Sequence, residues 1–446
     1  MQPPPTSRVP LPLRLALFRA LERLSSWRQA RPTAGAANPA PQAGARAAAS
    51  LWVFASTIGE VHAIEPFLDR LRSELGDPPL TLISDRATYG DAYRSKFPQA
   101  QLEQLDGSTA QVRSLLARQP PLMLLVAEIP PLLHDAPCRL SFATQHAARS
   151  AGVPVVLVNG WLYGYAPPSR MDRIENRLFA RDYAAGFDLA LVQTEAVRHR
   201  LVAAGADPAR VHVTGNIKFD AMGSATAGQP LSALHIALSG RGSGPLLVAG
   251  CVTETEHQRC VIDAFIHLRR TEPGARLVLA PRHPEDMPRM TALRALLDAS
   301  GLDVRYRSQC PAANAAASGS LLVLDTIGEL RGCYGVADAA FIGVDHNVLE
   351  PLAFGKPTFV SDGWNSNYPS YSAYRQLLDA GALAAVGSLD QLGPAWERHF
   401  AAVRVGQTGT HARVEQVVKA ARGAVERSIA AMRQARLLGP AGRGYA

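Results

Sequence analysis

The sequence predicts an α/β protein made of two doubly wound domains. From residue 51 onward, short apolar strand candidates alternate with helix-length segments, and each candidate is apolar along nearly its whole length. Strands of that kind are buried on both faces, which is typical of parallel sheets covered by helices. A Gly/Ser/Pro-rich break at 232–245 separates two runs of strands. With 446 residues, 47% hydrophobic and 19% charged, the chain is long enough for two such domains.

The strands can be placed in order along the chain. The first run is expected at 51–56, 80–84, 122–127, 153–160, 189–194 and 211–216. The second run is expected at 246–250, 276–281, 321–325, 339–343 and 357–361. The stretch 413–437 predicts one long amphipathic helix, because Val417, Ala421, Val425 and Ile429 share a stripe. We therefore expect domains at 50–235 and 246–405, a linker at 236–245, and a C-terminal helix and tail at 406–446.

Residues 1–49 form a basic leader. Residues 1–50 contain seven arginines and one acid, Glu22, so they carry +6 of the net charge of +8. A basic tail is no sign of a nucleic-acid-binding face, and no nucleic-acid partner is expected. Segment 11–32 has helical spacing in its leucines (Leu17, Leu21, Leu24) and interspersed arginines (Arg14, Arg19, Arg23, Arg28), and a Pro/Ala/Gly linker follows. Such a helix suits an anionic membrane surface; a disordered or partner-packed leader and an organellar transit peptide remain alternatives.

Missing motifs exclude several functions. No apolar run approaches the roughly 20 residues that a membrane span needs. The chain has no GxGxxG behind a strand and no GxxxxGK[ST], HExxH, GxSxG or paired CxxC. The cysteines (Cys138, Cys251, Cys260, Cys310, Cys333) are scattered and lack metal-ligand spacing. We expect free thiols in a reducing compartment and no metal site.

Two carboxylates follow strands of the first domain. FASTIGEVHAIEP (54–66) places Glu60 after the first strand and a turn containing Gly59. Glu60 is either a general base aimed at a cleft or a helix-start residue that favours the helix dipole. VAEIPP (126–131) places Glu128 after another buried strand, and the spacing equally allows a cleft-lining and a helix-start role.

Three polar clusters follow successive strands of the second domain. APRHPE puts Arg282 and His283 at a strand end, and DTIGELRGCYGVAD (325–338) predicts a helix starting near Gly328, whose free N–H groups suit a phosphate. DHNVLEP then brings His346, Asn347 and Glu350 to the next strand end. Because the carboxyl ends of parallel strands meet at one edge of the sheet, the clusters predict a site for an anionic nucleotide.

The motifs STIGEV, GNIKFD (215–220), APRHPE, DTIGELRGCYGVAD and HNVLEPLAFGKP, in this order, resemble those of the 3-deoxy-D-manno-octulosonic acid (Kdo) transferases. The resemblance runs from about residue 50 to 435. It implies the GT-B fold, with two Rossmann-like domains facing a central cleft. It also implies an inverting, metal-independent enzyme without a cofactor that moves Kdo from CMP-Kdo onto a lipid A precursor. Family members carry a membrane-associating N-terminal segment, which implies a peripheral protein at the cytoplasmic face of the inner membrane.

The resemblance assigns roles to individual residues. The catalytic base falls on Glu60, the second essential carboxylate falls on Glu128, and Lys218 matches a lysine of the family motif. The donor contacts that it implies are Pro281, Arg282, the turn Ile327–Gly328–Glu329, Asn347 and Glu350, with His283 and His346 beside them.

The chain departs from the family pattern at Phe54, at 127–131, at NGWLYGY (159–165) and at the short GVD loop (343–345). Most of these departures fall in the acceptor half or at the sugar-facing loop. Two alternatives therefore remain open. One is a transferase for another CMP-activated acidic sugar or another acceptor. The other is a non-catalytic nucleotide-binding homologue.

Overall fold

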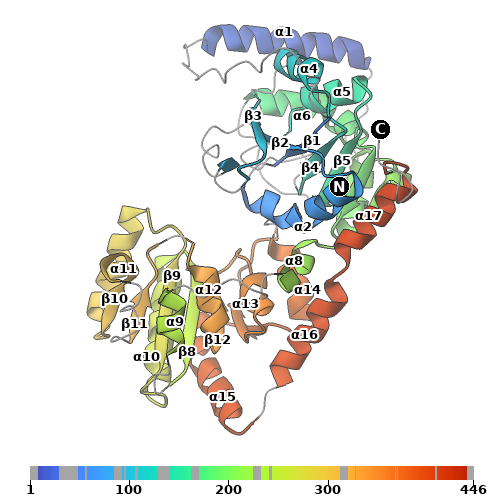
Figure 1. Cartoon of the computed structure of the whole chain (residues 1–446). Coiled ribbons are helices and arrows are strands. Elements are labelled where there is room, and N and C mark those ends of the chain that lie inside the picture. Colours follow the sequence, from blue (N-terminus) through green and yellow to red (C-terminus); the bar gives the residue numbers. More distant parts are fainter. Residues whose placement is uncertain are drawn as a thin grey trace. The chain divides into compact units, whose positions relative to one another are not determined.

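Two parallel sheets of seven strands each organise the chain, and Figure 1 shows both with their helices. The computed structural model describes residues 9–29, 49–55, 58–84, 93–94, 97–105, 109–128, 140–161, 170–224, 233–240, 244–311, 320–326, 328–366, 368, 370–406 and 409–438. The chain divides into two compact units. Unit 1 comprises Met1–Asp220 and Gly423–Ala446, and unit 2 comprises Ala221–Arg422. The predicted α/β class with two doubly wound sheets is confirmed.

The sheet of unit 1 consists of β1 (Leu51–Phe54), β2 (Leu80–Ser84), β3 (Gln101–Gln104), β4 (Met123–Ala127), β5 (Val155–Gly160), β6 (Leu189–Val192) and β7 (Val211–Val213). Their order is β3-β2-β1-β4-β5-β6-β7. The chain proceeds outward from β1 to β3 and then continues on the other side of β1, so the strand order reverses between β1 and β4. The inner strands β1, β4, β5 and β6 are buried along their whole length.

In the described residues of unit 1 the helices are α1 (Leu11–Gln29), α2 (Ile58–Glu74), α4 (Thr109–Arg118), α5 (Phe142–Ser150), α6 (Arg170–Ala184), α7 (Glu195–Ala204), α8 (Lys218–Ser224), which runs on into unit 2, and α17 (Ala424–Gln434). They cover both faces of the sheet (Figure 1). On one face α4, α5, α6 and α7 share a core that includes Phe142 and Phe179. On the other face α2 and α17 enclose a core that includes Phe67 and Ile429.

The sheet of unit 2 has the order β10-β11-β9-β8-β12-β13-β14. Its strands are β8 (Leu246–Val252), β9 (Arg276–Pro281), β10 (Val304–Tyr306), β11 (Leu321–Val323), β12 (Ala339–Ile342), β13 (Thr358–Ser361) and β14 (Ala384–Val386). Its helices are α9 (Ala233–Ser239), α10 (Thr255–Leu268), α11 (Met287–Ala299), α12 (Leu330–Val336), α13 (Leu349–Ala353), α14 (Ser370–Asp379), α15 (Leu392–Arg404) and α16 (Gly409–Ala421). The order reverses between β8 and β12, as it does between β1 and β4.

The sequence pattern misses β3, β10 and β14. All three strands lie at an edge of their sheet, and most of their residues are half-buried or exposed. An edge strand does not need apolar side chains on both faces, so it lacks the continuous apolar run that marks an inner strand of a parallel sheet.

The prediction of one long helix at 413–437 is wrong. The segment contains two helices, α16 and α17, separated at Gly423, which has a φ of 91°. That left-handed conformation is open to glycine and ends a helix. The break also changes the domain boundaries, because α16 belongs to unit 2 and α17 to unit 1. The chain passes between the units at 220/221 and 422/423, whereas the predicted linker at 236–245 overlaps α9.

Helix α1 confirms the predicted helix in the leader, but its faces differ from the expected ones. Leu15 and Phe18 are buried in the core of unit 1, and the Phe18 ring meets Phe179 of α6 edge to face at 5.6 Å. Arg14 is buried as well and pairs with Asp182 of α6 at 2.6 Å. Arg14, one of the arginines of the expected basic helix, therefore holds α1 to its own domain.

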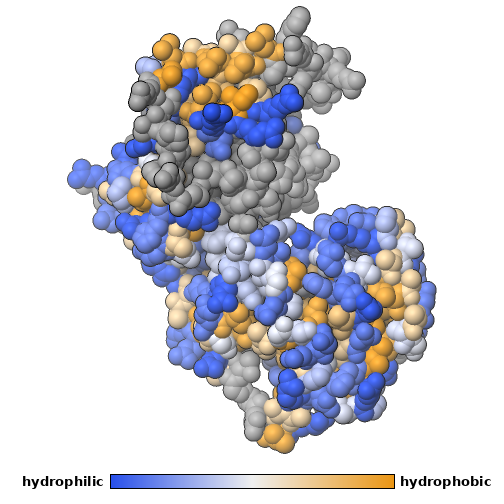
Figure 2. Space-filling model, turned by 180° about the vertical axis from the view of Figure 1, so that it is seen from behind, coloured by the Kyte–Doolittle hydropathy of each residue, from blue (hydrophilic) through white to orange (hydrophobic). Residues whose placement is uncertain are grey.

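The opposite side of α1 is exposed and apolar. Leu13, Leu17 and Leu24 are 60%, 54% and 62% exposed. Figure 2 shows hydrophobic surface gathered at the end of unit 1 where Figure 1 places α1. No helix in the described part of the chain has the length and hydropathy needed to cross a membrane.

Candidate functional site

In unit 1, Glu60 and Glu128 lie on either side of the point where the strand order reverses. Glu60 stands in the first turn of α2, which follows β1, and Glu128 directly follows β4. These two strands are paired neighbours in the sheet. Crevices at such a reversal are where α/β proteins bind ligands. Gly59, expected in a turn, lies within α2, so Glu60 is a helix-start residue whatever further role it has.

Glu128 is held in an unusual way. The residue is 2% exposed, and its φ of 51° lies in the left-handed region, which is rare for residues other than glycine. Such a conformation costs about 1–3 kcal/mol and is concentrated at functional sites. Its carboxylate receives the Lys218 ammonium at 2.8 Å on Oε1 and at 3.1 Å on Oε2. The structure thus brings together Glu128 and Lys218, two residues that are 90 positions apart.

In unit 2 the polar residues also gather at the reversal point. His346 follows β12, Thr253 follows β8, and Arg282 follows β9. The Nε2 atom of His346 lies 3.2 Å from Thr253 Oγ1 and 3.3 Å from Arg282 Nη1. Arg282 and Thr253 also line a cavity of about 710 Å³ together with His283, Arg289 and Asp345. That volume is within the range of small-molecule sites.

Burial and the positive charges of Arg282 and His283 lower the pKa of His346 to about 3. The imidazole is therefore neutral near pH 7, and a neutral Nε2 without a proton accepts the Arg282 Nη1–H, while Thr253 Oγ1 donates to the Cys251 carbonyl at 3.4 Å. His346 thus contacts the guanidinium of Arg282 without repelling it.

Glu350 follows His346 and Asn347 along the chain and stands in the first turn of α13. Burial raises the pKa of its carboxyl, against the influence of Arg331 and a bond from Asn347 Nδ2 at 3.4 Å. Asn347 Oδ1 also accepts the N–H of Leu349 at 3.1 Å, which fixes the start of α13. Because burial makes this carboxyl costly to ionise, it is well suited to accept hydrogen bonds from hydroxyl groups. Each such bond offsets part of the free-energy cost of removing the charge from water.

Other predicted donor residues have their side chains occupied. The Glu329 carboxylate accepts bonds from Arg307 at 3.0 Å and Thr326 at 2.6 Å, and His283 pairs with Glu285 at 3.0 Å. Pro281 ends β9, and Gly328 precedes α12 with a φ of 98°. The predicted helix after Gly328 starts at Leu330. Ile327 lies outside the described residues, as do 129–139 and 162–169.

Two polar residues of these sites, Thr253 and Asn159, were not predicted from the sequence. A signal was available for both, because Thr253 ends LLVAGCVT and Asn159 ends VPVVLVN, and each is a polar residue directly behind an apolar strand. The rarity of lysine in this chain also marks Lys218, independently of the motif that contains it. The lysines of the chain are Lys96, Lys218, Lys356 and Lys419, among 46 basic residues that are otherwise arginines.

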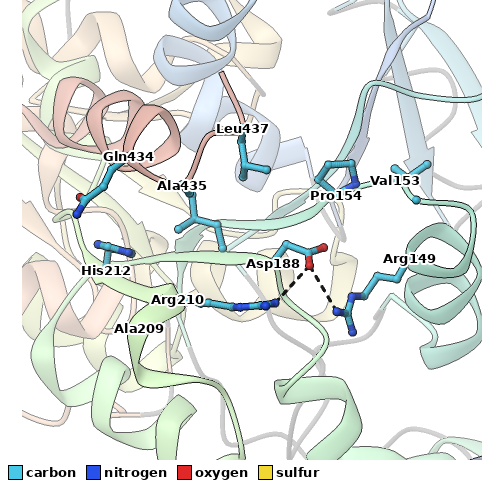
Figure 3. A pocket seen from close by; sticks show the side chains of 12 residues that line it. Arg149, Val153, Pro154, Asp188, Ala209, Arg210, His212, Gln434, Ala435 and Leu437 are labelled. Carbon is cyan, nitrogen blue, oxygen red and sulfur yellow. Dashed lines mark hydrogen bonds and ion pairs between the residues drawn. The ribbon is translucent and has the colours of Figure 1, made fainter. Parts of the chain in front are cut away.

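A further cavity of about 620 Å³ lies in unit 1, at the amino ends of β5, β6 and β7 (Figure 3). Asp188 stands between Arg149 and Arg210, with its Oδ1 3.4 Å from each guanidinium. Its Oδ2 accepts the N–H of Val155 at 3.0 Å. Asp188 therefore fixes the start of β5, and the cavity contains none of the predicted site residues. In the described part of the chain, no three His, Cys, Asp or Glu side chains gather to hold a metal ion.

Comparisons with known proteins point to one family. A family model described as 3-Deoxy-D-manno-octulosonic-acid transferase (kdotransferase) matches residues 20–221. The 3-deoxy-D-manno-octulosonic acid transferase of Bordetella pertussis is 30% identical over 381 residues, which cover 75% of this chain and 78% of the relative. The transferase of the same name from Chlamydia trachomatis serovar A is 27% identical over 314 residues, 68% of this chain and 67% of the relative.

Solved structures extend the comparison to the fold. A glycosyltransferase from Rickettsia africae ESF-5 superposes with a TM-score of 0.57, covering 87% of this chain and 99% of its own, at 8% identity. At that identity the likeness concerns the fold alone. Together with the two doubly wound sheets, it confirms a two-domain fold of the GT-B type.

Proposed function

Because the chain belongs to the 3-deoxy-D-manno-octulosonic acid transferase family and is a glycosyltransferase, we propose that it moves Kdo from CMP-Kdo to a lipid A precursor. The observation that carries the proposal is the buried Glu128 carboxylate at the reversal point of unit 1, which stands on a strained backbone and pairs with the half-buried Lys218. A nucleotide-binding homologue without turnover has no use for that arrangement, which costs stability.

The proposed reaction is a direct displacement with inversion. Glu60 removes the proton of the acceptor hydroxyl as that oxygen attacks the anomeric carbon of the sugar, and CMP leaves with its bonding electrons. Glu128 and Lys218 lie beside the same strand ends, where the ammonium suits the carboxylate of an acidic sugar or the negative charge of the departing phosphate. No protein–sugar bond forms in this scheme, and no metal is required by it.

The CMP moiety is assigned to unit 2. Arg282, in contact with neutral His346, supplies charge-assisted bonds to the phosphate. Asn347 and Glu350 are assigned to the ribose hydroxyls, because the buried Glu350 carboxylate gains from new donors. Since the Glu329 carboxylate is already bonded to Arg307 and Thr326, the turn at 328–329 contributes through its backbone.

The acceptor is a lipid, so the enzyme is proposed to act at the cytoplasmic face of the inner membrane as a peripheral protein. The exposed leucines of α1 support this location, together with the +6 charge of residues 1–50. The apolar side of the helix suits the acyl boundary, and the arginines suit anionic headgroups.

The deciding experiment measures CMP release by the purified full-length protein from CMP-Kdo, with and without a lipid A precursor. We expect release that depends on the acceptor. Glu60→Gln keeps the size of the side chain but takes up no proton, so turnover should fall by roughly 10²–10⁴-fold while CMP affinity stays nearly constant.

Glu65→Gln, the same change on the same helix, is the matched control and should keep full turnover. If Glu60 only favours the helix dipole, Glu60→Gln costs about 0.3–1 kcal/mol of stability and leaves turnover intact, which would end its assignment as the base. CMP release from another CMP-activated acidic sugar, or only in the presence of another acceptor, would change the proposed substrates and leave the proposed reaction class unchanged. Binding of CMP without turnover on any acceptor would favour the non-catalytic alternative.

A further inference from the structure

Asn159 is the most completely buried polar residue of the site in unit 1. It lies near the end of β5 with 0% exposure and a φ of 55°, so its backbone is left-handed like that of Glu128. The pairing of β5 with β6 shifts register between Leu157 and Gly160, which frees this part of the strand from the regular ladder. Gln193 Nε2 donates to the Asn159 carbonyl at 3.1 Å and holds the backbone in place.

The side chain of Asn159 bonds to two separate parts of the site. Its Nδ2 donates to Glu128 Oε1 at 2.8 Å and lies 3.3 Å from Asn216 Oδ1. Its Oδ1 accepts the N–H of Ile217 at 3.0 Å. An amide supplies a donor and an acceptor on two separate atoms, whereas a carboxylate lacks the donor and an aliphatic side chain lacks both.

These bonds determine where the two members of the ion pair stand. Glu128 comes from the end of β4, and Lys218 comes from the turn 216–218 that begins α8. Asn159 fixes the carboxylate through Nδ2 and the turn through Oδ1. Asn216 Oδ1 accepts the N–H of Lys218 at 3.1 Å and thereby extends the same network to the lysine backbone.

We propose that Asn159 is a positioning residue that holds Glu128 and Lys218 in register for the transfer reaction. The inference rests on the proposed function, because it takes the pair to be the part of unit 1 that meets the reacting groups. Asn159 itself acts through Glu128 and the 216–218 turn. Its amide donates to the charged Glu128 carboxylate. Loss of a hydrogen bond that orients a charged group moves the site out of its productive geometry.

Two variants test the proposal without straining the backbone, because Asp and Gly both tolerate a positive φ. Asn159→Gly removes both bonds, and Asn159→Asp keeps the acceptor for Ile217 and replaces the donor with a carboxylate beside Glu128. We expect kcat to fall by about 10–100-fold in both, the effect that loss of an orienting bond has at metal ligands. The KM for the donor should change much less than kcat, since the contacts assigned to the CMP moiety lie in unit 2.

The pH profile separates the two variants. Two adjacent carboxylates resist double ionisation, so the acid limb of the kcat profile should move to higher pH in Asn159→Asp and stay in place in Asn159→Gly. The matched control is Gln145→Leu in α5, which removes another buried amide of unit 1, one that donates to the Tyr183 carbonyl of α6. Its turnover per folded molecule should equal that of the unaltered protein.

A second readout does not depend on turnover. Labelling with [ε-13C]lysine yields signals from Lys96, Lys218, Lys356 and Lys419 only, and Lys218→Arg identifies the Lys218 signal by its loss. The Lys218 signal should shift in both Asn159 variants and not in Gln145→Leu.

If the Lys218 signal and kcat stay unchanged in the Asn159 variants, while only melting temperature falls, Asn159 is merely structural and the proposal is overturned. If the unaltered protein shows no turnover, the proposed function fails on its own, and the Lys218 signal still decides whether Asn159 holds the pair.

Discussion

At the residue scale, the two sites show how burial decides what a side chain can do. His346 and Glu350 are both buried near the same strand end, and burial favours the neutral form of each. The sequence predicted their neighbourhood, because a polar cluster followed an apolar strand. It could not predict that His346 would be a neutral acceptor for Arg282, because that depends on Arg282 arriving from β9, 64 positions earlier.

The lowered pKa of His346 predicts how stability depends on pH. In the unfolded chain the imidazole takes up a proton near its ordinary value of about 6.5, whereas in the folded protein it does so near about 3. Between these values the unfolded state binds more protons, so His346 makes the folded protein lose stability as the pH falls, by up to about 1.4 kcal/mol per pH unit. His346→Gln should therefore show a shallower fall in melting temperature between about pH 6 and 4.

His199→Gln is the control for this measurement, because His199 is an exposed histidine of unit 1 and is not among the groups that lower the pKa of His346. Its melting temperature should follow that of the unaltered protein across the same range. Parallel curves for His346→Gln and the unaltered protein would contradict a neutral buried imidazole at position 346.

At the element scale, the sequence predicted well those elements that are equally buried along their whole length. The inner strands of both sheets were predicted, because burial on both faces demands a continuous apolar run. The division between α16 and α17 was missed, because the stripe of apolar residues continues across it. Gly423 ends α16 through its left-handed backbone, and a residue from elsewhere in the chain fixes the start of α17: the Asp220 carboxylate accepts the N–H groups of Gly423 at 2.5 Å and Val425 at 2.6 Å.

This contact predicts that Asp220 acts as a helix cap supplied from a distance of 203 positions. Asp220→Ala should leave the first N–H groups of α17 without their acceptor. The expected cost is about 1–2 kcal/mol, or roughly 2–8 °C in the melting temperature of unit 1. Hydrogen exchange of α17 amides should accelerate as well.

Asp207→Ala is the matched control. Asp207 caps the exposed 3-10 turn Pro208–Arg210 by accepting the N–H of Ala209 at 3.0 Å. Because that turn is short and solvated, its loss should cost less and leave α17 exchange unchanged. An equal drop in melting temperature for both variants would show that Asp220 has no special importance for α17.

At the scale of the whole molecule, the sequence predicted two doubly wound sheets. It did not predict that the C-terminal segment 406–446 is divided between them, with α16 in unit 2 and α17 in unit 1. A stripe of apolar residues shows that a helix packs on something, and it does not show which sheet it packs on. The leader is a similar case. Its helical spacing predicted an amphipathic helix with one apolar side, whereas α1 has two: Leu15 and Phe18 face the core, and Leu13, Leu17 and Leu24 are exposed.

The two apolar sides of α1 lead to a specific test of membrane attachment. Removing residues 1–45 would expose the core that Leu15 and Phe18 cover. Truncation would therefore change the stability of the fold as well as the binding to vesicles. Replacing Leu13, Leu17 and Leu24 together by Ser alters only the exposed side. Each leucine contributes on the order of 1 kcal/mol when it enters the acyl boundary. The variant should therefore bind anionic vesicles at least about ten-fold more weakly, with an unchanged melting temperature.

Ile236, Val403 and Val405, replaced together by Ser, are the matched control, because they are exposed apolar side chains of unit 2. That variant should bind vesicles like the unaltered protein. Residual binding of the α1 variant should weaken further with salt, since the arginines of the leader remain and their attraction to anionic headgroups is screened. Vesicle binding that is equal in all three proteins would show that the exposed side of α1 serves some purpose other than membrane attachment.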